Sequence, residues 1–182
     1  MIYDLEGEAN MSQVVGMLYS AVRENSERLK SITVGMSQEE VDYKGPNNGY
    51  NSTAQLIRHI TLVDLNWVYR IKGEPLPNCF EEKYGPMIDE NNQLPMIKGQ
   101  SLNTLLAEYA RVIDMLEDVC TQLTAADLHK IVTFGHENEK QATIRWGLWH
   151  MADHNRYHQA HINLLRKWYK GKNVHINVTF SI

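Results

Sequence analysis

Apolar side chains recur at three- and four-residue steps along four long stretches of the chain. These stretches cover residues 11–34, 52–72, 101–123 and 143–170. At about 100° per residue, such spacing places the apolar side chains along one face of an α-helix. The pattern therefore predicts four amphipathic helices, the last of which ends at Gly171.

Capping residues mark the starts of two of these helices. Ser52 and Gln55 have the spacing of a capping box, in which the Ser hydroxyl and the Gln side chain satisfy free backbone donors. Ser101 precedes the third helix as a further N-cap residue. We therefore expect the second and third helices to begin directly after these serines.

The link between the second and third helices indicates how the helices are arranged. Residues 73–100 contain four of the five prolines and no sustained helical period. Helices of about 20 residues are about 30 Å long, and this link is long enough to cross the whole bundle. We therefore expect an all-α four-helix bundle with up-down-down-up topology, in which the second and third helices run parallel. Residues 1–182 would form one domain, with the bundle core over residues 10–170.

Two stretches have strand character and add a minor β component to this prediction. The first is Ile131–Phe134, within a region near residues 130–144. In the second, apolar and polar residues alternate strictly over residues 174–182, a period of two that is typical of a strand with one buried face. An isolated strand is not stable. We therefore expect this tail to pair with Ile131–Phe134, in the same chain or across a dimer.

Charge and composition exclude several classes of function. The chain carries 18 Lys and Arg against 22 Asp and Glu, a formal net charge of −4, whereas nucleic-acid-binding surfaces need clustered positive charge. No apolar run approaches the roughly 20 residues that cross a bilayer, and the first ten residues are acidic and polar. Cys79 and Cys120 show no metal or redox spacing. We expect a cytoplasmic protein that binds neither nucleic acid nor membranes.

Histidine is the residue type that stands out. Four of the eight histidines fall between residues 150 and 161 of the last helix. On the helical wheel, His154 and His158 lie one turn apart in the middle of the apolar stripe. The other members of this apolar stripe are Ile144, Gly147, Met151, Ile162, Leu165 and Tyr169. The opposite, polar side of the helix carries Arg145, Asn155, Arg156, Gln159, Asn163, Arg166 and Lys167. Unpartnered buried polar groups cost about 1–3 kcal/mol each, and one divalent ion bound by both imidazoles removes that cost.

A third ligand is expected from the second helix. His59 is the only histidine in the first three helices, and it sits at the edge of its helix's apolar stripe. We therefore predict that His59, His154 and His158 bind one divalent ion. Imidazole sites accept Zn, Ni, Cu or Fe, and zinc is the first expectation among them. His150 and His161 lie at the border of the stripe, and we expect both to be solvated residues outside the ligand set, although His161 could enter the pocket. The alternative is that these residues are hydrogen-bonded core histidines without a metal.

Two stretches resemble the DinB superfamily of four-helix bundles. They are residues 51–60, with the sequence NSTAQLIRHI, and residues 149–158, with the sequence WHMADHNRYH. The similarity extends over about residues 10–170. The resemblance implies that His59, His154 and His158 bind one divalent ion, for which zinc, nickel or iron would serve. It also implies kinship with thiol-dependent transferases and isomerases and with zinc-dependent, hydrolase-like members.

Three nitrogen ligands leave a coordination position open, as in catalytic metal sites. Together with the resemblance, this favours a metal-dependent S-transferase or related hydrolase that acts on a small-molecule thiol and an electrophilic substrate. Gln55, Asn66, Tyr157 and His161 are candidates for the pocket, and no side chain stands out as a general base. The rival hypotheses are a non-catalytic, stress-related bundle with a structural or sensing metal, and a metal-free interaction module.

Two tryptophans bear on assembly. Trp149 and Trp168 project from the last helix away from the middle of its apolar stripe. Exposed aromatic side chains often mark an interface, and the family resemblance points the same way. We therefore expect a homodimer, unless the long link over residues 73–100 covers both rings.

Overall fold

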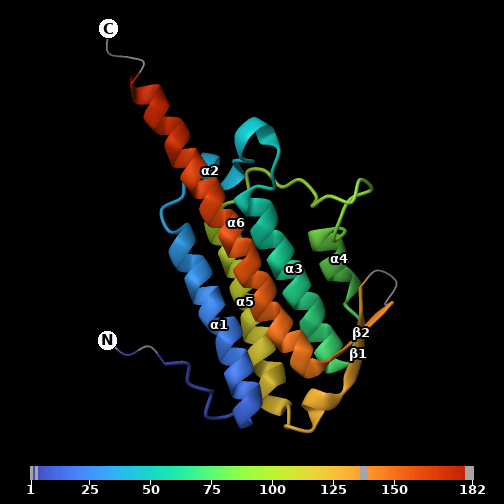
Figure 1. Cartoon of the computed structure of the whole chain (residues 1–182). Coiled ribbons are helices and arrows are strands. Elements are labelled where there is room, and N and C mark those ends of the chain that lie inside the picture. Colours follow the sequence, from blue (N-terminus) through green and yellow to red (C-terminus); the bar gives the residue numbers. More distant parts are fainter. Residues whose placement is uncertain (1, 3, 136–138, 179–182) are drawn as a thin grey trace.

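The computed structural model describes residue 2 and residues 4–135 and 139–178, and its main feature is a bundle of four long helices (Figure 1). These helices are α1 (Gln13–Thr33), α3 (Thr53–Lys72), α5 (Leu102–Gln122) and α6 (Ile144–Val178). In Figure 1, α1 and α6 run upward while α3 and α5 run downward. The predicted up-down-down-up bundle, with its parallel second and third helices, is confirmed.

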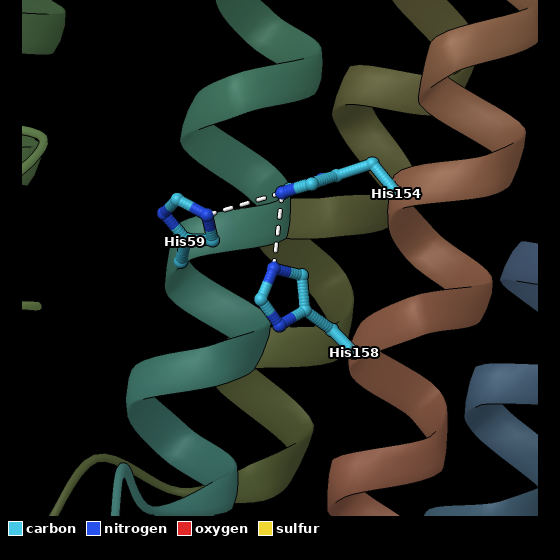
Figure 2. Close-up of side chains that lie close together, drawn as sticks. All are labelled: His59, His154 and His158. Atoms are coloured by element: carbon cyan, nitrogen blue, oxygen red, sulfur yellow. Dashed lines mark hydrogen bonds between the residues drawn. The ribbon is translucent and has the colours of Figure 1, made fainter.

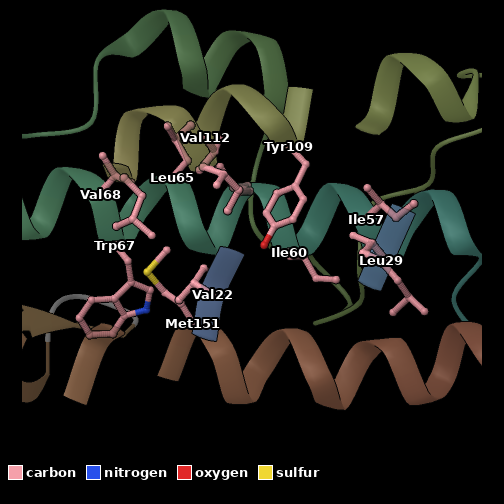
Figure 3. Close-up of a cluster of buried hydrophobic side chains, with 14 of the residues drawn as sticks. Val22, Leu29, Ile57, Ile60, Leu65, Trp67, Val68, Tyr109, Val112 and Met151 are labelled. Atoms are coloured by element: carbon pink, nitrogen blue, oxygen red, sulfur yellow. The ribbon is translucent and has the colours of Figure 1, made fainter. Parts of the chain in front are cut away.

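The four helices enclose one apolar core. Helix α1 packs against α5 and α6, and α3 packs against the same two helices on the other side. Figure 3 shows part of the core, where Leu29, Ile60 and Leu65 are fully buried. Helices α3 and α6 approach closely at Gly147, where a Cβ atom would lie 2.5 Å from the Trp67 ring. The absence of a side chain at this position lets the indole pack directly on the backbone of α6.

Short elements connect the long helices. They are α2 (Gln38–Asp42), the 3₁₀ turn η1 (Pro46–Asn48), α4 (Asn78–Tyr84), the 3₁₀ turn η2 (Asp127–His129) and the strands β1 (Ile131–Phe134) and β2 (Lys140–Thr143). The two strands pair antiparallel, with Ile131 opposite Thr143. The predicted minor strand component near residues 130–144 is therefore confirmed.

Both predicted N-caps are present. Ser52 and Gln55 form a reciprocal capping box at the start of α3, and the Ser101 hydroxyl accepts a hydrogen bond from the Thr104 N–H at the start of α5. Each serine satisfies a backbone donor that the first turn of its helix leaves free.

The long link between α3 and α5 is tied to the start of the bundle by side chains. Gln55 Nε2 donates to the carbonyl oxygens of Leu94 and Pro95, at 2.9 and 3.3 Å. The Gly99 N–H donates to the Asp42 carboxylate, with a distance of 3.1 Å to Oδ2. These bonds hold one part of the link against the N-terminal end of α3 and another part against α2.

The C-terminal tail differs from the prediction. Helix α6 continues through Gly171 to Val178, so the predicted strand is wrong over residues 174–178, and residues 179–182 lie outside the described part of the chain. Strand β1 instead pairs with β2, at the opposite end of the bundle from the end of α6 (Figure 1). A helix satisfies its backbone groups locally, whereas a strand needs a partner. A glycine inside a helix costs only about 1 kcal/mol, so Gly171 does not end α6.

Within the described residues, no helix combines the length and the apolar character needed to cross a membrane.

Candidate metal centre

Three histidine side chains from two antiparallel helices meet at one point. His59 comes from α3, and His154 and His158 come from successive turns of α6 (Figure 2). The Nε2 atom of His154 lies 3.1 Å from Nε2 of His59 and 3.0 Å from Nε2 of His158. One ring nitrogen from each residue lies within 4.8 Å of the other two. The structure thus brings together the three histidines that the sequence singles out.

Hydrogen bonding among these rings leaves the site incompletely satisfied. A neutral imidazole has one N–H donor and one acceptor nitrogen. The single in-plane lone pair of His154 Nε2 cannot accept well-aligned hydrogen bonds from His59 and His158 together. A shared cation would satisfy all three nitrogens at once. Zn–N bonds of 2.0–2.1 Å with tetrahedral angles place ligand nitrogens about 3.3 Å apart, which is close to the observed separations of 3.0 and 3.1 Å. The three residues therefore fit a divalent ion.

Burial keeps the three imidazoles neutral. It lowers the pKa of His59 to about 4, with a smaller contribution from the positive charge of Arg58. Burial also lowers the pKa of His154 and His158 to about 3 each, and the neighbouring imidazoles add to the effect. The Nδ1 atoms of all three are buried without a partner among the described residues. Because only a neutral imidazole coordinates a metal, the site is in its ligand-competent form at neutral pH.

A cavity of about 750 Å³ lies beside the triad. His59, His158 and His161 form part of its wall, and Tyr50 and Trp168 form another part. The rings of Tyr50 and Trp168 pack with their centroids 4.8 Å apart. A small molecule in this cavity would therefore contact two of the three clustered histidines.

The other predicted pocket residues lie in different places. His161 lines the cavity, but its ring centroid is 5.9 Å from that of His158, and it does not join the cluster of three donors. Gln55 is buried in the capping box and bonded to the link between α3 and α5. Asn66 lines two other cavities, and its amide donates to the Leu62 carbonyl oxygen. Tyr157 is 61% exposed, with its ring beside His158.

The aromatic side chains around the triad also differ in their surroundings. His150 stacks on Trp146, with ring centroids 4.7 Å apart and planes within 8° of parallel. Trp149 is 48% exposed. Trp168 is half-buried, and its ring packs on Tyr50 rather than facing solvent. Of the two tryptophans expected at an interface, Trp149 is therefore the more exposed.

A second polar cluster, which the sequence reading did not find, lies inside the bundle. Tyr109 donates to Asp64 Oδ2 at 2.9 Å, and Asn155 Nδ2 donates to the Tyr109 oxygen at 2.5 Å. Gln159 Nε2 donates to Asn155 Oδ1 at 2.7 Å and to the Asn25 carbonyl oxygen at 2.8 Å. We call these five residues the polar spine, because they connect all four long helices.

The polar spine corrects the predicted orientation of α6. Asn155 and Gln159 were expected on the solvent side, but they are 0% and 1% exposed, while His154 and His158 lie half-buried at the edge of the buried face. Met151, Asn155, Gln159 and Ile162 follow one another at steps of four, four and three residues. This spacing indicates a buried helix face. Asn and Gln conceal that face in the sequence, because amide side chains are usually counted as exposed.

Asp64 is the carboxylic acid of the polar spine. It is fully buried, and burial raises the pKa of its carboxyl to about 8, although the hydrogen bond from Tyr109 works in the opposite direction. At neutral pH the carboxyl is therefore largely protonated, as expected for an acid without a cation beside it.

Comparison with known proteins supports the resemblance seen in the sequence. A family model described as the DinB superfamily matches residues 21–162. An uncharacterized protein YkkA of Bacillus subtilis (strain 168) is 49% identical over 168 residues, which make up 92% of this chain and 94% of the relative. The family match spans all three clustered histidines.

Proposed function

This chain belongs to the DinB superfamily, and we propose that it is a metal-dependent enzyme acting on small molecules, as an S-transferase that uses a small thiol or as a related hydrolase. The observation that carries the proposal is the convergence of three neutral imidazole nitrogens beside a cavity. His59, His154 and His158 would hold one divalent ion, with zinc as the first expectation and nickel or iron as further candidates.

The arrangement of protein groups supports a catalytic site rather than a closed structural one. Catalytic zinc sites have three protein ligands and an open position, whereas structural sites are closed by four. His161 stays outside the cluster, and the cavity reaches His59 and His158. A divalent ion bound here would supply a Lewis acid that lowers the pKa of an adjacent water or thiol. The chain's own contribution is to present neutral nitrogens, position the small molecule beside them and limit its contact with water.

One observation favours a second candidate function. The three histidines come from α3 and α6, so an ion shared between them would also join two long helices. We therefore keep a non-catalytic bundle with a structural or sensing metal as the alternative. Both functions predict that zinc raises the melting temperature, and only the enzyme consumes substrate.

Turnover separates these two functions. Protein purified without a nickel column would first be analysed for its metal content. The zinc-loaded parent, His154→Ala and His150→Ala would then be assayed for loss of a small thiol in the presence of an aryl halide. We expect turnover in the parent and in His150→Ala, and its loss in His154→Ala. Zinc-dependent stabilisation without turnover for any thiol would favour the structural alternative. Equal turnover in His154→Ala would overturn the proposed site.

We also propose that the protein forms a homodimer. Trp149 is 48% exposed and Ile131 is 60% exposed, and exposed apolar side chains of this size are frequent at interfaces. Sedimentation equilibrium should give about twice the chain mass of 21.0 kDa. A monomer mass at high protein concentration would contradict the dimer.

A further inference from the structure

The cavity beside the triad has an unusual charge for this protein. The whole chain has 22 acidic residues and a net charge of −4, yet no Asp or Glu is among the described residues that line the cavity. Lys44 is the one Lys or Arg among these lining residues. Lys44 therefore gives the lining a positive charge that no Asp or Glu of the described lining residues offsets. A charge of this kind attracts anions and disfavours cations.

Lys44 is positioned by the loop that carries it. The Tyr50 N–H donates to the Lys44 carbonyl oxygen at 2.9 Å, which closes the loop over residues 44–50. Gly45 has a φ of +72°, and a Cβ atom there would lie 2.6 Å from the Tyr50 ring. Lys44 itself is half-buried and has no carboxylate within ion-pair distance in the described part of the chain. Its ammonium group is therefore available to a ligand.

The rest of the cavity wall suits the apolar part of an organic molecule rather than a bare inorganic ion. Tyr50 and Trp168 provide an aromatic surface, and Leu164 and Leu165 extend the apolar area. Neutral amides such as Asn51 complete the polar part of the wall. A cavity of about 750 Å³ lies in the range of sites for small organic molecules.

From these observations we infer that the cavity binds a small organic anion, whose acid group pairs with Lys44 while its apolar part packs on Tyr50 and Trp168. This inference rests on the proposed function, because it names the chemical class of a molecule on which the same site acts. The bound anion lies within reach of His59 and His158, which line the same cavity. Carboxylate, sulfonate and phosphate share the chemistry that Lys44 recognises.

Binding of matched thiols to the cobalt-loaded protein tests the inference. 3-Mercaptopropionate, 2-mercaptoethanesulfonate, 2-mercaptoethanol and cysteamine would be titrated while cobalt–thiolate absorption is followed. We expect the two anionic thiols to bind about tenfold more tightly than the neutral thiol, a ratio typical of one charge-assisted hydrogen bond. Cysteamine should bind most weakly. The two anions also show whether the site prefers a carboxylate or a sulfonate.

Matched variants and a metal-free measurement separate the inference from the proposed function. Lys44→Met should remove the preference for anions. Lys140→Met should retain it, because Lys140 belongs to β2, which lies at the opposite end of the bundle from the start of α3 (Figure 1). In the metal-free protein, 3-phenylpropionate should bind more tightly than 3-phenylpropan-1-ol by saturation-transfer NMR. Failure of cobalt to bind would count against the proposed function alone. Equal binding of the acid and the alcohol, or an unchanged preference in Lys44→Met, would overturn the inference.

Discussion

Helix α6 carries two sets of polar side chains one residue apart, and the two sets are satisfied in opposite ways. Asn155 and Gln159 donate to protein acceptors in the polar spine. His154 and His158 instead direct Nε2 atoms at each other and at His59, and leave their Nδ1 atoms without partners among the described residues. The two amides make three hydrogen bonds within the folded chain without a ligand, although Gln159 Oε1 lacks a partner in the described part of the chain. The histidines make hydrogen-bond contacts only with one another at Nε2 within that part, and they need a ligand to be satisfied there.

The comparison also explains how the site is oriented. The polar spine joins α6 to Tyr109 of α5 and to Asn25 of α1, and through Tyr109 to Asp64 of α3. A buried, hydrogen-bonded network disfavours alternative packings, because they would leave polar groups unpaired. Each amide directly follows one of the α6 histidines in the sequence. Fixing the amides therefore fixes the direction in which the two imidazoles point.

The largest expected effect concerns Asp64 and pH. Its pKa is raised from 3.8 to about 8, so between these values the folded protein holds a proton that the unfolded chain has released. The free energy of unfolding should therefore fall as the pH rises, by about 1.4 kcal/mol per pH unit, or about 4 kcal/mol between pH 5 and pH 8. Asp64→Asn should remove this contribution and unfold at a higher urea concentration than the parent at pH 8.

Urea titrations of both proteins in the presence of a chelator measure this effect. Taking the difference between variant and parent cancels the titration of all other groups. If the difference stays constant from pH 5 to pH 8, the Asp64 carboxyl is ionised in the folded protein, and the predicted pH dependence is wrong.

Truncating the two polar sets should reveal their different roles. Asn155→Ala removes two buried hydrogen bonds and leaves a cavity, so we expect a loss of about 3 kcal/mol in unfolding free energy without metal. His154→Ala should cost about 1 kcal/mol or less under the same conditions, since its half-buried ring makes no well-satisfied hydrogen bond. Chemical denaturation with a chelator gives both values. Equal losses would remove the distinction between the two sets.

A smaller loss of unfolding free energy is expected when one hydroxyl of the polar spine is removed and its other hydrogen bonds remain. Tyr109→Phe deletes the hydroxyl between Asp64 and Asn155 and keeps the ring. We expect a loss of about 1–2 kcal/mol. Zinc binding should weaken but persist, because Gln159 still holds α6 to α1. Complete loss of zinc binding in a folded Tyr109→Phe protein would mean that the hydroxyl belongs to the site itself.

Local sequence patterns were sufficient for much of this structure. Periodicity and the Ser52 and Ser101 caps located the helices, and the four-residue step from His154 to His158 placed two imidazoles side by side. The rotation of α6 was missed because Asn155 is buried by a hydrogen bond to Tyr109, which lies 46 residues away. Of the four predicted pocket residues only His161 lines the cavity, because the wall combines side chains from the loop around residues 44–51, from α3, from residues 92–94 and from α6. Contacts between such distant segments leave no periodic signal in the sequence.

X-ray absorption at the zinc edge tests the shared metal site most directly. The spectra would be recorded for the parent, His59→Ala and His150→Ala, each with one equivalent of zinc. The parent and His150→Ala should show three imidazole nitrogens at about 2.0–2.1 Å together with a further light atom. His59→Ala should show fewer imidazoles or should no longer retain zinc. A zinc–sulfur distance of about 2.3 Å in the parent, or an unchanged spectrum and affinity in His59→Ala, would contradict the account.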